Sequence, residues 1–445
     1  IAIDQENGVV RRLKEQVTLF PGAMNLGATG NIDLTKEVGR ATGLELRSVG
    51  INWNLSPVLD VNNNPDNPVI NVRSFGEDPE KVGEFGTAWM KGVQEAGVVA
   101  TLKHFPGHGD TAVDSHLDMP AIHHHLDRLN KVELLPFIKG IANGADVIMT
   151  AHIYFSTLEP DYGRPATLSK NVLTGLLREQ LGFEGVITTD CLEMKAISET
   201  VGVANGALMA AKAGADLLMV SHTYHYQKEA ADKLLKAVEV GEFSEERLTQ
   251  SYDRIIKLKD KYLTLERPKP YDKNQHSQLA ARAYRESICL LKQDTIPIQE
   301  RESKKILALY SSNKPLFQAA ESGEQLLIPD ILKAYEADFD FLDIYSELAR
   351  GSQLDDLKSK IEHYDTLIIF TLTLEKNDSL TKLLIGIVRE FNTTVISLRS
   401  PYDFNVLKET NNFICAFDDS PQAIKAALDV LFGKQLSTAR CPVTI

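Results

Sequence analysis

The sequence predicts an α/β fold in which a (β/α)8 barrel is followed by a three-layer α/β sandwich. Short apolar stretches alternate with amphipathic helical stretches over residues 1–264, a pattern typical of a parallel sheet. Nearly every apolar stretch in that region ends in a polar or ionisable residue. A charged segment with two prolines, 265–273, reads as a linker to a second α/β region at 274–445.

Six short apolar stretches are the strand candidates of the barrel. Their length and their small or β-branched residues are typical of buried strands. They lie at 1–4, 51–60, 98–105, 146–153, 185–190 and 216–222. The helical stretches 131–144 and 203–214 lie between strand candidates and end in Gly144 and Gly214, because glycine readily ends a helix.

The residues at the strand ends favour a closed barrel over an open, doubly wound sheet. A barrel gathers the carboxyl ends of all its strands at one mouth, whereas an open sheet concentrates its site near the switch point. The strand-end residues are Asp4, Asp60, Lys103 with His104, His152, Asp190 and His222. Since only six strands are counted, two more are expected upstream of Ile1. No signal peptide is visible, but the chain starts abruptly inside an apolar strand, so a cytoplasmic and an exported protein both stay open.

The second region repeats the alternation without a comparable cluster of acids and bases. Before the linker, 241–263 is predicted to be a helix with Ser244 as its N-cap. The later strand candidates are 305–311, 340–346, 365–373, 393–400 and 413–417. They end mostly in serine, threonine or apolar residues, so this region is expected to supply no essential acid or base.

Composition excludes several classes of partner. The net charge of −13, from 48 basic and 61 acidic residues, disfavours nucleic acid and anionic membrane surfaces. No run of about 18 apolar residues exists, so no membrane span is expected. The cysteines 191, 289, 415 and 441 have neither a metal-binding spacing nor a dense disulfide pattern, and are expected to be free thiols.

The stretch "LKHFPGHGDTAVDSHLD", residues 102–118, is the strongest candidate for a catalytic loop. It follows a buried strand, and Pro106, Gly107 and Gly109 break regular structure after His104. Loops on a rigid scaffold are where chemistry concentrates. A solvated loop of the same composition is the alternative, but such a loop rarely begins with a Lys-His pair at a strand end.

Two acids and one histidine suggest catalysis. Asp190 at a strand end is suited to be a nucleophile or an electrostatic stabiliser, although alone it reads as a helix N-cap. Asp114 and His116 are two residues apart, so in an extended loop their side chains point to the same side. A carboxylate beside an imidazole favours its protonated form and yields a general acid.

Other polar residues allow alternative interpretations. One alternative is a metal site, whose possible ligands are His104, His108, Asp110, Asp114, His116 and Asp118. Their spacing follows no known ligand pattern and Lys103 adds positive charge, so no metal and no other cofactor is expected. Arg73 is suited to bind ligand oxygens, or it pairs at the surface with Glu77 or Asp78. His123, His124 and His125 are expected to be mostly solvated.

The motif "KHFPGHGDTAVDSH" closely resembles the signature of the β-N-acetylglucosaminidase branch of glycoside hydrolase family 3. The blocks "IAIDQENG", "SPVLDVNNNP", "RSFGEDP", "MTAHI", "GVITTDCLEM" and "RIIKLKDKY" follow in family order. In the second region, "SICLLKQDTIPI" and "GKQLSTARCPVTI" resemble the second domain of the two-domain members. One departure is Asn7, which stands where the family usually has glycine.

The resemblance implies a bacterial-type enzyme that removes terminal β-linked N-acetylglucosamine with retention, through a covalent glycosyl-enzyme. Asp190 then matches the nucleophile, and His116 with Asp114 matches the acid/base pair. The positions that hold the sugar match Asp4, Arg73, Lys103 and His104, with His108 placed less securely. The expected partner is a glycan containing N-acetylglucosamine, with muropeptide fragments of the cell wall as the usual source. A phosphorylase and a metal-dependent hydrolase on the same barrel stay open.

Overall fold

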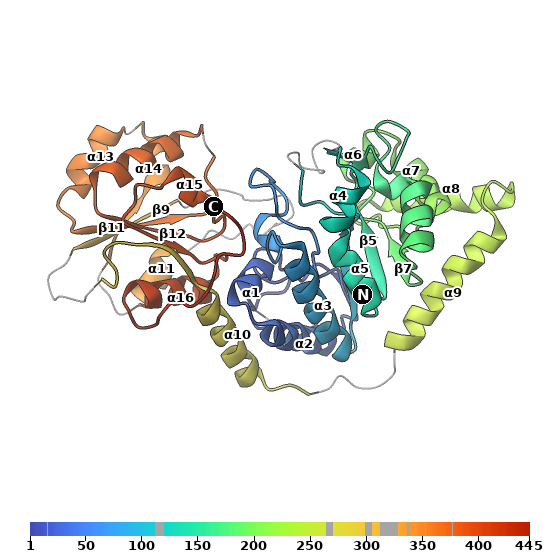
Figure 1. Cartoon of the computed structure of the whole chain (residues 1–445), viewed down its shortest axis with the longest axis horizontal. Coiled ribbons are helices and arrows are strands. Elements are labelled where there is room, and N and C mark those ends of the chain that lie inside the picture. Colours follow the sequence, from blue (N-terminus) through green and yellow to red (C-terminus); the bar gives the residue numbers. More distant parts are fainter. Residues whose placement is uncertain are drawn as a thin grey trace. The chain divides into compact units, whose positions relative to one another are not determined.

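The computed structural model describes residues 1–15, 17–111, 120–263, 270–298, 305–311, 328–335, 339–351, 353–375 and 377–445. The chain divides into two compact units. The first contains residues 1–6 and 32–272, and the second contains 7–31 and 273–445. Figure 1 shows the elements of both. None of the described helices combines the length and the apolar character needed to cross a membrane.

The first unit is built on a parallel sheet, which confirms the predicted α/β class. Its strands pair in the order β1 (Ala2–Ile3), β2 (Trp53–Asn54), β3 (Val99–Phe105), β5 (Val147–Thr150) and β7 (Val186–Thr188). Two of the predicted strands are longer than the observed strands. The predicted strand 51–60 is observed as β2 and an isolated bridge between Val58 and Lys103. The stretch 216–222 contributes one bridge, from Leu217 to Thr188.

Helices connect these strands. They are α2 (Ile32–Ser48), α3 (Pro79–Glu95), α4 (Leu126–Lys131), α5 (Leu135–Ala142), the π-helix η3 (Asn171–Gln180), α6 (Lys195–Ser198), α7 (Val203–Ala213), α8 (Tyr224–Glu239) and α9 (Glu245–Tyr262). Of these, α7 and α9 fall close to the predicted ranges 203–214 and 241–263. The stretch 131–144 was predicted as one helix, but a turn separates α4 from α5. The predicted cap of α9 is confirmed, because the Ser244 side chain accepts a hydrogen bond from the Arg247 N–H.

The second unit has a six-stranded sheet with helices on both faces. Its order is β10 (Phe339–Asp343), β9 (Ile306–Tyr310), β11 (Thr366–Thr371), β12 (Thr393–Ser397), β13 (Asn412–Cys415) and β8 (Cys289–Gln293). The first five strands are parallel, and β8 is an antiparallel edge strand that was not predicted. Figure 1 shows α13 (Leu354–Ile361), α14 (Ser379–Glu390) and α15 (Asp403–Val406) on one face of the sheet. On the other lie α11 (Ile328–Lys333) and α16 (Pro421–Leu431).

Residues 7–31 belong to the second unit although they precede most of the first unit in sequence. They include α1 (Ala23–Thr29), which packs on α10 (Lys273–Ser287). The buried Asn25 amide donates to Ser287 Oγ at 2.9 Å and to the Ala416 carbonyl oxygen at 2.7 Å. Asn7 starts this segment with a φ of 67°, a left-handed conformation that asparagine tolerates.

Glycines allow α2 and α3 of the first unit to pack with their backbones in contact. A Cβ added at Gly39 would lie 2.6 Å from the Trp89 carbonyl oxygen, and one at Gly92 would lie 2.2 Å from that of Lys36. Each helix thus places a glycine against the backbone of the other helix. The short separation holds α3, and the strand β3 that follows it, in place.

Gly92→Ala is expected to lower the free energy of unfolding by about 1–3 kcal/mol, because the added methyl group forces the two helices apart. Gly175→Ala in η3 is the matched control, since a Cβ there meets no heavy atom closer than 3.9 Å. Alanine at that helical position should be neutral or stabilising. Chemical denaturation of both variants checks this, and equal midpoints would contradict the close packing.

Candidate active site

A buried lysine at the end of β3 organises the first part of the site. Lys103 lies within a strand whose residues are all buried, so its ammonium group must be paired to be tolerated. Its Nζ lies 2.9 Å from Asp4 Oδ1 and 2.6 Å from Glu6 Oε1. Asp4 and Glu6 follow β1, which is separated from β3 by β2 in the sheet.

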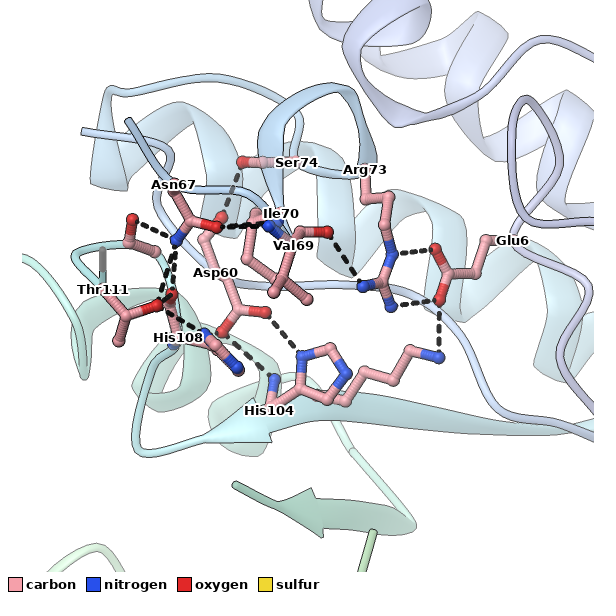
Figure 2. Close-up of polar contacts among 12 residues, drawn as sticks. Glu6, Asp60, Asn67, Val69, Ile70, Arg73, Ser74, His104, His108 and Thr111 are labelled. Carbon is pink, nitrogen blue, oxygen red and sulfur yellow. Dashed lines mark hydrogen bonds and ion pairs between the residues drawn. The ribbon is translucent and has the colours of Figure 1, made fainter. Parts of the chain in front are cut away.

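Glu6 also binds Arg73, which lies in the short 3-10 helix η1 (Asn71–Arg73). The guanidinium donates through Nε at 2.9 Å and through Nη2 at 2.8 Å to the two carboxylate oxygens, as Figure 2 shows. Burial alone would raise the pKa of Glu6, but the charges of Arg73 and Lys103 outweigh it and hold that pKa well below its ordinary value. Glu6 is therefore an ionised carboxylate shared by two buried cations.

Asp60 is a buried carboxylate that holds the two histidines following Lys103, as Glu6 holds Lys103 and Arg73. Its Oδ2 lies 2.7 Å from His104 Nδ1, and its Oδ1 accepts the backbone N–H of His108 at 2.6 Å (Figure 2). Burial would raise the pKa of Asp60, but the neighbouring His104 lowers it overall. With Nδ1 committed to Asp60, His104 Nε2 has no hydrogen-bond partner within the described ranges and is available to a ligand.

The start of the loop after β3 is held by Asn67. The Asn67 amide donates to the carbonyl oxygens of His108 and Gly109, both at 2.8 Å, while its oxygen accepts two backbone N–H groups. Only glycine fits at 109, because a Cβ there would lie 1.7 Å from the Val61 carbonyl oxygen.

Burial lowers the pKa of His108 to about 4, so this imidazole is neutral. His108 Nδ1 lies 2.9 Å from Thr111 Oγ1.

Asp190 follows β7 and is half-buried. Its Oδ1 accepts the Cys191 N–H at 2.7 Å. Burial would raise the pKa of Asp190, but His152, His104, this hydrogen bond and Lys103 together lower it to about 2. Since both His104 and Lys103 act on the Asp190 carboxylate, the ends of β3 and β7 contribute to the same electrostatic environment.

The structure therefore brings together most of the site residues predicted from sequence. Asp4, Lys103 and Arg73 form one ion-pair network through Glu6, and Asp60 holds His104 and the backbone of His108 beside it. Of these residues, Lys103 and His104 act on Asp190 after β7. Asp114 and His116 lie outside the described residues. His222 was predicted among the strand-end groups but is exposed, and its backbone N–H donates to Glu193.

The role of Glu6 was not predicted from the sequence. Arg73 was assigned either to a ligand or to a surface pair with Glu77 or Asp78, whereas it is buried against Glu6. The available signal was an acid two residues beyond the strand-end Asp4, in "IAIDQENG". A buried arginine needs a carboxylate, and the local sequence around Arg73 does not reveal one 67 positions away.

A second polar group lies beside the catalytic-loop candidate. Ligand atoms of Asp110, His124 and Glu133 lie within 4.8 Å of one another, which is close enough to hold a metal ion. However, Arg128 already supplies a positive charge there, with its Nη1 2.6 Å from Glu133 Oε1. His124 was expected to be mostly solvated but is half-buried, with its Nε2 2.6 Å from Asp110 Oδ2.

His104 and His108 were also considered as metal ligands. The His104 side chain contacts Asp60 instead, and the His108 side chain contacts Thr111.

The chain is similar in sequence to known beta-hexosaminidases. Beta-hexosaminidase A from Pseudoalteromonas piscicida is 43% identical over 286 residues, covering 59% of this chain and 47% of that protein. The chain thus spans about half the length of that relative. A beta-hexosaminidase from Hydrogenovibrio crunogenus is 34% identical over 262 residues, covering 57% of this chain and 71% of the relative.

Solved structures extend the likeness to the whole chain. A glycoside hydrolase family 3 beta-N-acetylglucosaminidase from Paenibacillus sp. is 38% identical, with a TM-score of 0.92 over 100% of this chain and 86% of that one. The family model "Glycosyl hydrolase family 3 N terminal domain" matches residues 1–258, which include Glu6, Arg73, Lys103 and Asp190. Since this match spans more than half of the chain and contains the whole network described above, the chain belongs to glycosyl hydrolase family 3.

Proposed function

We propose that the protein is a retaining exo-β-N-acetylglucosaminidase that releases terminal β-linked N-acetylglucosamine. The observation that carries the proposal is Asp190, a half-buried carboxylate that Lys103 and the nearby histidines keep ionised. A carboxylate that is ionised at neutral pH and lies at a strand end fits the nucleophile of a retaining glycosidase. The names of the similar beta-hexosaminidases support N-acetylhexosamine as the sugar.

In the proposed first step, Asp190 attacks the anomeric carbon while His116, oriented by Asp114, donates a proton to the leaving oxygen. In the second step, water attacks the glycosyl-enzyme and His116 takes its proton. Most glycosidases use two carboxylates for this chemistry, and a histidine replaces one of them here. The described start of this loop is anchored at His108 by Asn67 and Asp60.

The terminal sugar is proposed to bind against Asp4, Arg73, Lys103 and His104, with His108 behind them. Asp4 leaves 36% of its side chain exposed, and His104 Nε2 is uncommitted, so both offer polar atoms to sugar hydroxyls. Glu6 and Asp60 are fully engaged with the protein and fix these groups in place. Fixed donors and acceptors lose less entropy on binding than mobile ones.

We further propose that the parallel sheet of the first unit belongs to a closed (β/α)8 barrel with this site at its mouth. The strands pair in their order along the chain, as they do in such barrels. The proposed natural substrates are muropeptide fragments of the cell wall that end in N-acetylglucosamine.

Sugar specificity is tested by the rates on an aryl β-N-acetylglucosaminide and on the matching β-glucoside. We expect kcat/KM to be at least about 100-fold higher on the first, because a site that hydrogen-bonds the acetamido group would leave its own polar atoms unpaired with glucose. Equal rates would contradict the assignment. The same assay with added phosphate, and with a chelator, separates hydrolysis from phosphorolysis and from metal dependence.

The roles of Asp190 and His116 are tested by a leaving-group series. Asp190→Ala should abolish turnover of every substrate. His116→Ala should lose about 10²–10⁴-fold on sugar aglycones but much less in the first turnover of acidic phenol substrates, which need no proton to leave. Asp114→Ala should follow the same trend with a smaller loss. An equal loss of rate for good and poor leaving groups in His116→Ala would show that histidine is not the acid.

Glu6→Gln tests the shared carboxylate. Removing this charge leaves Lys103 and Arg73 buried with less compensation, so we expect a loss of about 3–5 kcal/mol in the free energy of unfolding. Glu84→Gln is the control, since Glu84 pairs with Lys81 at the surface and should cost less than about 1 kcal/mol. In protein that stays folded, Glu6→Gln should raise KM more than it lowers kcat. A stability loss no larger than that of the control would contradict the role given to Glu6.

A further inference from the structure

The first unit contains a cavity of about 530 Å³ that the proposed hydrolysis does not use. It lies between η3, the end of α7, the turn at 241–244 and the first turns of α9 (Figure 1 labels α7 and α9). A volume of this size is typical of sites for small molecules.

The cavity lies at the opposite end of β7 from Asp190. Arg178 in its wall donates through Nη1 to the carbonyl oxygens of Phe183 at 2.7 Å and Gly185 at 2.5 Å. Gly185 directly precedes β7, whereas Asp190 follows it. A ligand in the cavity would therefore not occupy the place of the sugar.

The lining is strongly basic. Five of its residues carry positive side chains: Lys170, Arg178, Lys212, Arg247 and Arg254. Only Glu179 and Glu242 are acidic, and Glu242 is neutralised by Lys212, whose Nζ lies 2.5 Å from its Oε1. Glu245 and Glu246, in the first turn of α9, are not among the lining residues.

One buried carboxylate, that of Asp216, faces the three arginines. Its oxygens lie 2.5 Å from Arg178, 3.3 Å from Arg247 and 3.2 Å from Arg254. Burial and the charges of the other two arginines lower the pKa of Arg178 to about 10, in spite of Asp216. Three guanidinium groups that share a single negative charge leave an excess that an anion would neutralise.

Two of these cations keep donors available. Arg254 gives one nitrogen to Asp216, and its other N–H groups have no partner within the described ranges. Lys170 is exposed and forms no ion pair with any residue that the structure describes. Guanidinium binds phosphate oxygens with two parallel hydrogen bonds, and an ammonium group complements it as a point charge.

We propose that this cavity binds a phosphate group, held by Arg254 and Lys170, with Arg178 and Arg247 adding positive charge in the wall. The group comes either from inorganic phosphate or from a phosphorylated sugar. Thr174, Gln250 and Glu179, which also line the cavity, offer partners for sugar hydroxyls.

Calorimetric titration of the full chain at constant ionic strength tests the site with three probes: N-acetylglucosamine 6-phosphate, inorganic phosphate and N-acetylglucosamine. We expect both phosphates to bind and the neutral sugar not to. Tighter binding of the ester identifies a sugar phosphate as the ligand, and equal binding identifies phosphate alone.

The variants locate the binding. Arg254→Gln should weaken it about tenfold and Lys170→Gln about threefold, as expected for losing one charge-assisted contact. Lys170→Gln removes no ion pair, so it should fold even where Arg254→Gln does not. Lys228→Gln, an exposed lysine on α8 paired with Asp232, is the matched control and should bind like the unmodified protein. Failure of both phosphates to bind, or equal affinity in Lys170→Gln and the control, would overturn the proposal.

Discussion

The ion pairs of the Glu6 carboxylate are the interaction on which the site depends. Removing Lys103 and Arg73 from water would be unfavourable without a shared counter-charge, because an isolated buried ion costs several kcal/mol. Glu6 supplies that charge to both cations at once, with contacts of 2.6 to 2.9 Å. The two positive side chains are thereby fixed beside each other, and Lys103 in turn helps to keep Asp190 ionised. A fixed electrostatic environment needs no rearrangement when charge develops during a reaction.

A hierarchy of support follows from this arrangement. Asp60 repeats the principle for His104, and Asn67 repeats it with neutral groups for the backbone of the loop. In each case one side chain that binds only protein fixes the position of a neighbouring group. The supporting residues come from the segments after β1 and β2, so the site depends on the correct pairing of neighbouring strands.

Local patterns in the sequence predicted what depends on local structure. The buried strands, the helix that begins after Ser244 and the polar residues at the strand ends all follow from the properties of adjacent residues. The pairing of Glu6 with Arg73 could not be predicted this way, because burial of Arg73 arises from tertiary packing. For the same reason β8 could not be predicted, because this edge strand pairs with β13, more than 100 positions later in the chain. The hydrogen bonds of Asn25 with Ser287 and Ala416 could not be predicted either, because they also join distant parts of the sequence.

The segment 7–31 gives the protein an unusual order of assembly. The chain leaves the first unit after Glu6, enters the second, returns at Ile32, and crosses again at Lys273. During synthesis from the amino terminus, Asn25 and α1 must wait for about 400 further residues before the Ala416 backbone that receives them exists. A fragment of residues 32–272 would also lack β1, Asp4 and Glu6. The interleaved connectivity therefore means that no single break in the gene separates the two units cleanly. A break after Asp272 keeps every residue of the first unit but leaves residues 7–31 attached to it, apart from the rest of the second unit.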